Sequence, residues 1–159
     1  MIGQTKFLLL AGIGSAALLA GAFAFQYIGG MAPCTLCIWQ RWPHGAAVVI
    51  GVLALAFGGR ILPVLGAAAV ATSAAIAAFH VGVEQKWWEG LASCTAGSIE
   101  GISTADLLNP DVLVAAPVRC DAIAWTMFGV SMAGWNMIVS LVLVAVWLMA
   151  ARRDLVGAR

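Results

Sequence analysis

The chain has 159 residues, of which 63% are hydrophobic and only 9% are charged. A soluble domain carries about 25% charged residues, so this composition excludes a soluble globular protein, which needs a polar surface. The formal net charge is +1 and no basic run occurs, which argues against binding to nucleic acid, because phosphate recognition needs clustered Lys and Arg side chains. The sequence therefore predicts a single integral membrane domain.

Long uncharged stretches divide the chain into four predicted membrane-spanning helices. About 20 apolar residues, each rising 1.5 Å, cross a hydrocarbon core of roughly 30 Å. The predicted spans cover residues 7–25, 43–59, 61–83 and 125–150, approximately. The second span is the shortest, and its Pro43 is expected in the first helical turn, where a missing N–H does no harm.

The first stretch has a second interpretation, as a cleaved signal peptide. Lys6 precedes the apolar run, and Ala22-Phe23-Ala24 resembles a cleavage site. The run from Phe7 to Phe25 is longer than the usual signal core, which favours a span. The segment that follows lies on the outer side in either case.

Charged and aromatic residues predict that both termini lie in the cytoplasm. With this orientation the inner side holds five Lys or Arg residues and the outer side three, as the positive-inside rule requires. Five of the seven Trp residues also fall at the predicted outer boundary, where indole rings favour the headgroup region. The predicted fold class is an all-α membrane protein: a four-helix transmembrane bundle with two outer loops, at about residues 26–42 and 84–124.

All four cysteines fall in these outer loops, outside every predicted span. Cys34 and Cys37 directly precede the second span, and Cys94 and Cys120 lie in the second loop. Disulfides persist on the non-cytoplasmic side of a membrane. Three interpretations follow: two structural disulfides, a zinc site, or a thiol–disulfide relay between two redox pairs.

The spacing of the cysteines favours the relay. Two residues between Cys34 and Cys37 close too small a loop to stabilise the chain much by entropy. A Cys-x-x-Cys pair is well suited to exchange, because the neighbouring thiol can attack and release a mixed disulfide. A zinc site would need His44 or His80 to converge on the sulfur atoms, and the second cysteine pair lacks the usual ligand spacing.

The segment Ala32–Arg41, APCTLCIWQR, resembles the Pro-Cys-x-x-Cys-(x)3-Arg signature of the DsbB family, the membrane disulfide-bond formation protein B. The stretch HVGVE at 80–84 and the stretch RCD at 119–121, followed by Trp125, are also similar to that family. Four spans with a cysteine pair in each outer loop complete the resemblance, which covers nearly the whole chain.

The resemblance implies a function that supports protein disulfide bond formation. Such proteins lie in the bacterial inner membrane, reoxidise a periplasmic DsbA-like dithiol oxidase and pass two electrons to ubiquinone or menaquinone. It implies that the reduced partner attacks a Cys94–Cys120 disulfide and that Cys94 holds the mixed disulfide. Cys120 would then exchange with Cys34, and Cys37 would deliver the electrons to the quinone.

General physical chemistry supports a quinone-facing role for this segment. Cys37 lies at the start of a predicted helix, where the dipole favours a thiolate. Arg41 follows one turn later and could hold both that thiolate and a quinone oxygen, although an arginine at a membrane boundary can also simply extend into the headgroups. His80, an ionisable group near the outer end of the third span, is a further candidate to contact quinone or to bond within the bundle.

Two alternatives to this interpretation remain. One is a non-catalytic membrane scaffold whose loops are fixed by Cys34–Cys37 and Cys94–Cys120 disulfides. The other is a quinone-linked thiol oxidase of the vitamin K epoxide reductase type, which usually carries its quinone-side Cys-x-x-Cys late in the chain. Here the motif precedes the second span, which favours the DsbB-like interpretation.

Overall fold

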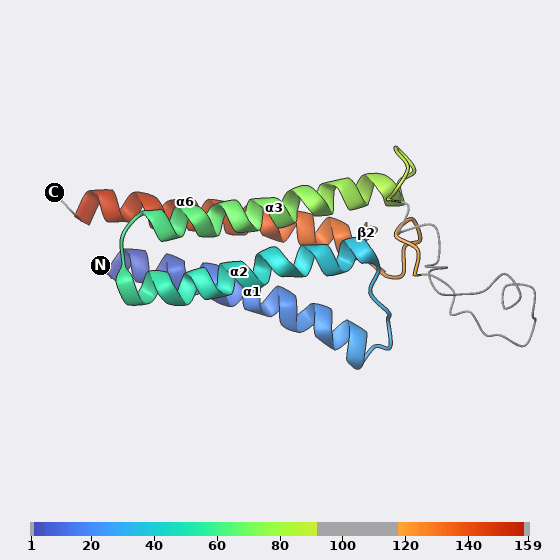
Figure 1. Cartoon of the computed structure of the whole chain (residues 1–159), viewed down its shortest axis with the longest axis horizontal. Helices are drawn as coiled ribbons and strands as arrows, with labels where there is room; N and C mark the ends of the chain where they lie inside the picture. The colour runs from blue at the N-terminus through green and yellow to red at the C-terminus, as the bar shows by residue number, and fades with distance from the viewer. Residues whose placement is uncertain (1, 92–117, 158–159) are drawn as a thin grey trace, which may run out of the picture.

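Four helices make up the body of the described part of the protein. The computed structural model describes residues 2–91 and 118–157, and the side chains of residues 3–91 and 118–152. The helices of this described part are α1 (Ile2–Tyr27), α2 (Thr35–Phe57), α3 (Ile61–Glu84) and α6 (Met132–Gly157). They run side by side along the long axis, with the two chain ends and the α2–α3 turn at one end of the bundle and the α1–α2 connection at the other (Figure 1).

Three of these helices are long and apolar enough to cross a membrane. The stretches that meet this requirement are Gly3–Tyr27, Ile61–Glu84 and Met132–Arg152. Each consists mainly of apolar residues, so lipid-facing surfaces need no polar cover. The predicted all-helical bundle is confirmed in this respect.

Helix α2 begins at the cysteine motif. The sulfur of Cys34 caps the helix by accepting a hydrogen bond of 3.2 Å from the backbone N–H of Cys37. The Cys-x-x-Cys pair therefore occupies the first helical turn. Pro43 lies in the interior of the same helix, so the expectation that it stands in the first turn is wrong. The helix starts eight residues before Pro43, and the proline removes only one hydrogen bond, to the carbonyl of Trp39.

A short hairpin precedes the last helix. Strands β1 (Thr126–Met127) and β2 (Val130–Ser131) pair in antiparallel register. Phe128 and Gly129 form the turn with φ of 52° and 75°, as a two-residue hairpin of type I′ requires. Helix α6 consequently starts at Met132, later than the residue near 125 at which the fourth span was expected to begin.

The end of the bundle that holds the chain termini is packed around Trp147. This side chain is fully buried, and its ring lies over Gly66 so closely that a Cβ there would approach it to 2.7 Å. Small residues such as Ala11, Ala47 and Ala67 complete this core. Small residues at such positions let membrane helices approach closely. Buried polar side chains, among them Gln40, His44 and His80, lie toward the opposite end.

Candidate functional site

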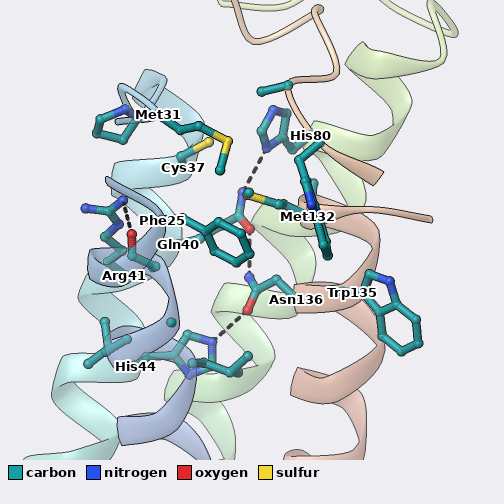
Figure 2. Close-up of a pocket in the computed structure, with 18 of the residues that line it drawn as sticks. Phe25, Met31, Cys37, Gln40, Arg41, His44, His80, Met132, Trp135 and Asn136 are labelled. Atoms are coloured by element: carbon teal, nitrogen blue, oxygen red, sulfur yellow. Dashed lines mark hydrogen bonds between the residues drawn. The ribbon is translucent and has the colours of Figure 1, made fainter. Parts of the chain in front are cut away.

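A cavity of about 370 Å³ lies among the four helices near the cysteine motif. Its walls are mostly apolar and include Phe25, Met31 and Met132 (Figure 2). The polar side chains that reach it are Cys37, Gln40, Arg41, His44, His80 and Asn136. A concave, largely apolar space with a few polar groups is typical of a small-molecule site.

The two cysteines of the motif are free thiols that lie in contact. The sulfur of Cys34 donates a hydrogen bond to the sulfur of Cys37 across 2.7 Å. A disulfide bond measures about 2.05 Å, so closing one needs a shift of less than about 1 Å. Cys37 borders the large cavity, whereas Cys34 is buried and borders a second, smaller cavity of about 60 Å³.

The contact between the two thiols shifts their pKa values in opposite directions. Cys34 precedes helix α2, and Cys37 lies in its first turn. The hydrogen bond from Cys34 is the main cause that lowers the pKa of Cys37 to about 7; burial opposes it and the charge of Arg41 supports it. The same contact and burial raise the pKa of Cys34 well above its usual range. Cys37 therefore ionises near neutral pH, and Cys34 keeps its proton.

Arg41 is held against α1 beside the cavity. Its Nη1 donates to Gln26 Oε1 at 2.5 Å and its Nη2 to the carbonyl oxygen of Ala22 at 3.4 Å. The guanidinium carbon also lies 5.0 Å from the centre of the Phe23 ring, within range of a cation–π interaction. The Nε of Arg41 is buried, and no described residue accepts its hydrogen bond. Arg41 thus presents a fixed cation at the wall of the cavity.

A ladder of hydrogen bonds crosses the bundle from His80 to His44. Gln40 Nε2 lies 3.0 Å from His80 Nδ1, and Asn136 Nδ2 donates to Gln40 Oε1 at 2.7 Å. His44 Nε2 lies 3.0 Å from Asn136 Oδ1 (Figure 2). Both histidines and Gln40 are buried, so the polar atoms of the ladder must find their partners inside the protein. His44 Nδ1 has none among the described residues.

Two backbone carbonyls fix the direction of these hydrogen bonds. Gln40 Nε2 also faces the Leu36 carbonyl oxygen at 3.1 Å, so this atom must be the donating NH₂ group. Ser73 Oγ donates to the Gln40 carbonyl oxygen and can accept from Asn136 Nδ2. His80 Nδ1 is therefore an acceptor, and the neutral imidazole carries its hydrogen on Nε2.

The hydrogen on His80 Nε2 points at the cysteine cluster. This atom lies 3.1 Å from the carbonyl oxygen of Cys120, 3.7 Å from the sulfur of Cys34 and 3.9 Å from Glu84 Oε1. The sulfur atoms of Cys34 and Cys37 and this nitrogen all lie within 4.8 Å of one another, so one histidine does approach the sulfur pair. A metal-bound imidazole normally donates from its other nitrogen, whereas here that nitrogen accepts from Gln40. The arrangement fits a hydrogen-bond donor better than a zinc ligand.

The structure brings most of the predicted site residues together. Cys34, Cys37 and His80 form one cluster, and Arg41 borders the same large cavity. Cys120 is fully buried against Cys34 and is disulfide-bonded. Cys94 lies outside the described residues.

The sequence did not assign the polar ladder that supports His80. Gln40 and His44 are four residues apart and therefore share one face of α2. Two polar residues on one face of an apolar helix are a signal for a buried network. Asn136, which joins them from α6, carries no such signal, because a single amide does not show which neighbour it faces.

The fold and the site define a helical membrane protein with a reactive dithiol at one end of its bundle. The chain matches the protein-family model described as Disulfide bond formation protein DsbB over residues 4–150. Disulfide bond formation protein B of an Azoarcus species is 31% identical over 150 residues, which cover 87% of each chain. Disulfide bond formation protein B 1 of Burkholderia lata is 32% identical over 165 residues, which cover 97% of this chain and 94% of that one. No solved structure matches the chain.

The chain belongs to the DsbB family of disulfide bond formation proteins. It is accordingly a multi-pass membrane protein with a disulfide oxidoreductase role. The resemblance of its cysteine motif to that family is confirmed.

Proposed function

We propose that this protein is a thiol:quinone oxidoreductase of the bacterial inner membrane. It reoxidises a periplasmic DsbA-like dithiol oxidase and passes two electrons to ubiquinone or menaquinone. The observation that carries this proposal is the position of Cys37: a thiol with a pKa of about 7 lies on the wall of an apolar cavity. A thiolate is the form that gives up electrons in such exchanges.

The cavity residues fit a quinone. Its apolar walls suit a ring and the start of an isoprenoid tail. Arg41, Cys37 and His80 border the same space, and the guanidinium of Arg41 offers N–H donors to a ring oxygen. These three residues would hold the quinone, which supplies a two-electron acceptor that diffuses within the membrane.

The cysteines would act in sequence. The reduced partner attacks the Cys94–Cys120 disulfide at Cys94, and the released Cys120 thiolate attacks the oxidised pair at Cys34. That exchange frees Cys37 as a thiolate beside Arg41. The burial of Cys34 and Cys120 in one cluster supports this order. The second thiol of the partner then releases Cys94, which attacks Cys120 and frees Cys34. Free Cys34 and Cys37 with a disulfide-bonded Cys120 correspond to the state that awaits the quinone.

The membrane arrangement completes the proposal. Helix α2 serves as the fourth span, the two termini lie in the cytoplasm, and the cysteine-bearing end faces the periplasm. Both termini lie at one end of the bundle and the cysteine motif lies at the other (Figure 1), which supports this orientation. A soluble partner can then reach the cysteines while the cavity stays open to lipid.

Steady-state turnover tests the function. The purified full-length protein is mixed with a reduced DsbA-like protein and a short-chain ubiquinone, and quinone absorbance is followed. We expect rapid quinone reduction by the natural sequence and none by Cys37→Ser, with both proteins showing the same thermal unfolding midpoint in detergent. No turnover by the natural sequence, with all four cysteines resistant to reduction, would instead support a structural scaffold.

A further inference from the structure

Closure of the Cys34–Cys37 disulfide requires the removal of one proton. Cys37 enters the reaction as a thiolate, whereas Cys34 holds its proton in the hydrogen bond to Cys37. A thiolate, not a thiol, attacks sulfur. Cys34 must therefore lose its proton to some acceptor before it can attack Cys37.

His80 is the nearest ring, but it cannot act as this acceptor. Its Nε2 lies 3.7 Å from the Cys34 sulfur. The hydrogen bond from Gln40 to Nδ1 leaves the hydrogen on Nε2, and that hydrogen faces the Cys120 carbonyl oxygen at 3.1 Å. A nitrogen that already carries a hydrogen has no lone pair for another proton.

A buried carboxylate borders the same small cavity. Glu84 is the last residue of α3, and its side chain is only 5% exposed. Its Oε2 accepts a hydrogen bond from Ser131 Oγ, which leaves Oε1 directed toward His80. The cavity of about 60 Å³ is bordered by Glu84 together with Cys34 and Cys37. About 10–15 Å³ of such space accommodates one water molecule, so water can connect the thiol with the carboxylate.

We propose that Glu84 is the general base that takes the proton of Cys34, through water in this cavity, when the disulfide closes. The inference rests on the proposed function only in taking Cys34 and Cys37 as the redox pair. The Cys34 S–H bond breaks and its proton passes to the carboxylate. The Cys34 thiolate then attacks the Cys37 sulfur and forms the S–S bond. The bond between Cys37 and the oxidant bound to it breaks, and its electron pair leaves with that oxidant.

The groups around Glu84 allow the proton to leave toward the outer solution. Those that face it are His80 on its own helix, the two thiols at the start of α2, Ser131 before α6, and Arg119 from the outer segment. Arg119 is exposed and forms an ion pair with Asp121. The charge of Arg119 is therefore paired with Asp121 and not with Glu84. Because Arg119 is exposed, it lies on the solvent side of the small cavity.

A chromogenic aromatic disulfide tests this role without quinone. The full-length protein carries Ser at positions 94 and 120, so that only Cys34 and Cys37 react. Attack by the Cys37 thiolate releases one coloured thiolate, and closure by Cys34 releases a second. We expect Glu84→Gln to slow the second release at neutral pH by about 100-fold or more, the usual contribution of a general base, and to leave the first within about twofold.

The pH profile separates a base from a structural role. The second release should level off with rising pH in the natural sequence, once Glu84 is ionised. In Glu84→Gln it should keep rising by about tenfold per pH unit, because Cys34 must then ionise unaided. Glu84→Asp should restore the plateau at a lower rate. The exposed acid Glu89 supplies the matched control, since Glu89→Gln should change neither release.

Two results would overturn the assignment. One is a second release in Glu84→Gln with the rate and pH profile of the natural sequence. The other is equal slowing of both releases, which would show that Glu84 supports the fold of the cluster. A failure of quinone reduction alongside a normal Glu84 effect would count against the proposed function alone.

Discussion

Replacing Cys34 with Ala should make Cys37 a weaker acid and a stronger nucleophile. With a pKa of about 7, Cys37 is about half ionised at pH 7, whereas at the ordinary value of 9.0 about one molecule in a hundred is ionised. Complete loss of the pKa shift would thus reduce the fraction of Cys37 present as thiolate at pH 7 by about 50-fold. Thiolate nucleophilicity rises with pKa by a Brønsted coefficient of about 0.4–0.5, which regains roughly eightfold.

These two effects predict rate curves that cross. At pH 7 the alkylation of Cys37 by iodoacetamide should be up to about sixfold slower in Cys34→Ala, and at pH 10 up to about eightfold faster. The full values are upper limits, because Arg41 still lowers the pKa of Cys37 in the variant. Alkylation of the full-length protein is quantified at this residue by mass spectrometry from pH 5 to pH 10.

A matched variant isolates the hydrogen bond. Cys34→Ser keeps a hydrogen-bond donor at this position. The pH midpoint of Cys37 alkylation should therefore stay closer to pH 7 in this variant than in Cys34→Ala. The reasoning is refuted if Cys34→Ala titrates at the same pH as the natural sequence. That result would assign the acidity of Cys37 to Arg41 and the helix terminus rather than to its partner thiol.

Three further substitutions, one of them with a matched control, test other parts of the account. Arg41→Lys should weaken quinone reduction more than exchange with the soluble partner, because lysine keeps the charge but loses the planar fork; equal loss in both half-reactions would make Arg41 structural. Gly66→Ala should lower the thermal unfolding midpoint in detergent, because the added Cβ would lie 2.7 Å from the Trp147 ring and such overpacking costs about 1–3 kcal/mol. Gly12→Ala, whose Cβ meets nothing within 4 Å, should not lower it. Cys120→Ser should accumulate a mixed disulfide with the reduced DsbA-like partner on a non-reducing gel, because the resolving thiol is gone; rapid release of the partner would contradict the relay.

Local patterns in the sequence were sufficient to predict the helical membrane fold and the cysteine motif. Uncharged runs of about 20 residues identify apolar helices whatever their partners. The same local reasoning failed at Pro43, because the helix begins at the Cys34 cap and extends through the proline. A proline marks a helix start only when no stronger capping group lies upstream.

The support around His80 could not be predicted, because it depends on which helix faces meet. Gln40 and Asn136 are 96 positions apart, and only the packing of α2 and α6 against α3 brings their amides together. The proton position on His80 follows from this contact and from the Leu36 carbonyl. The sequence shows the imidazole; the fold decides which of its nitrogens can donate.

An anaerobic single-turnover measurement tests the central claim most directly. Protein with reduced Cys34 and Cys37 is mixed with one equivalent of short-chain ubiquinone, without any soluble partner, and then quenched with acid. Quinol is measured by chromatography, and the Cys34–Cys37 disulfide by mass spectrometry. We predict one quinol for each disulfide closed, with neither product in Cys37→Ser. Disulfide closure without quinol, or quinol formed equally by Cys37→Ser, would contradict electron transfer from this pair to the quinone.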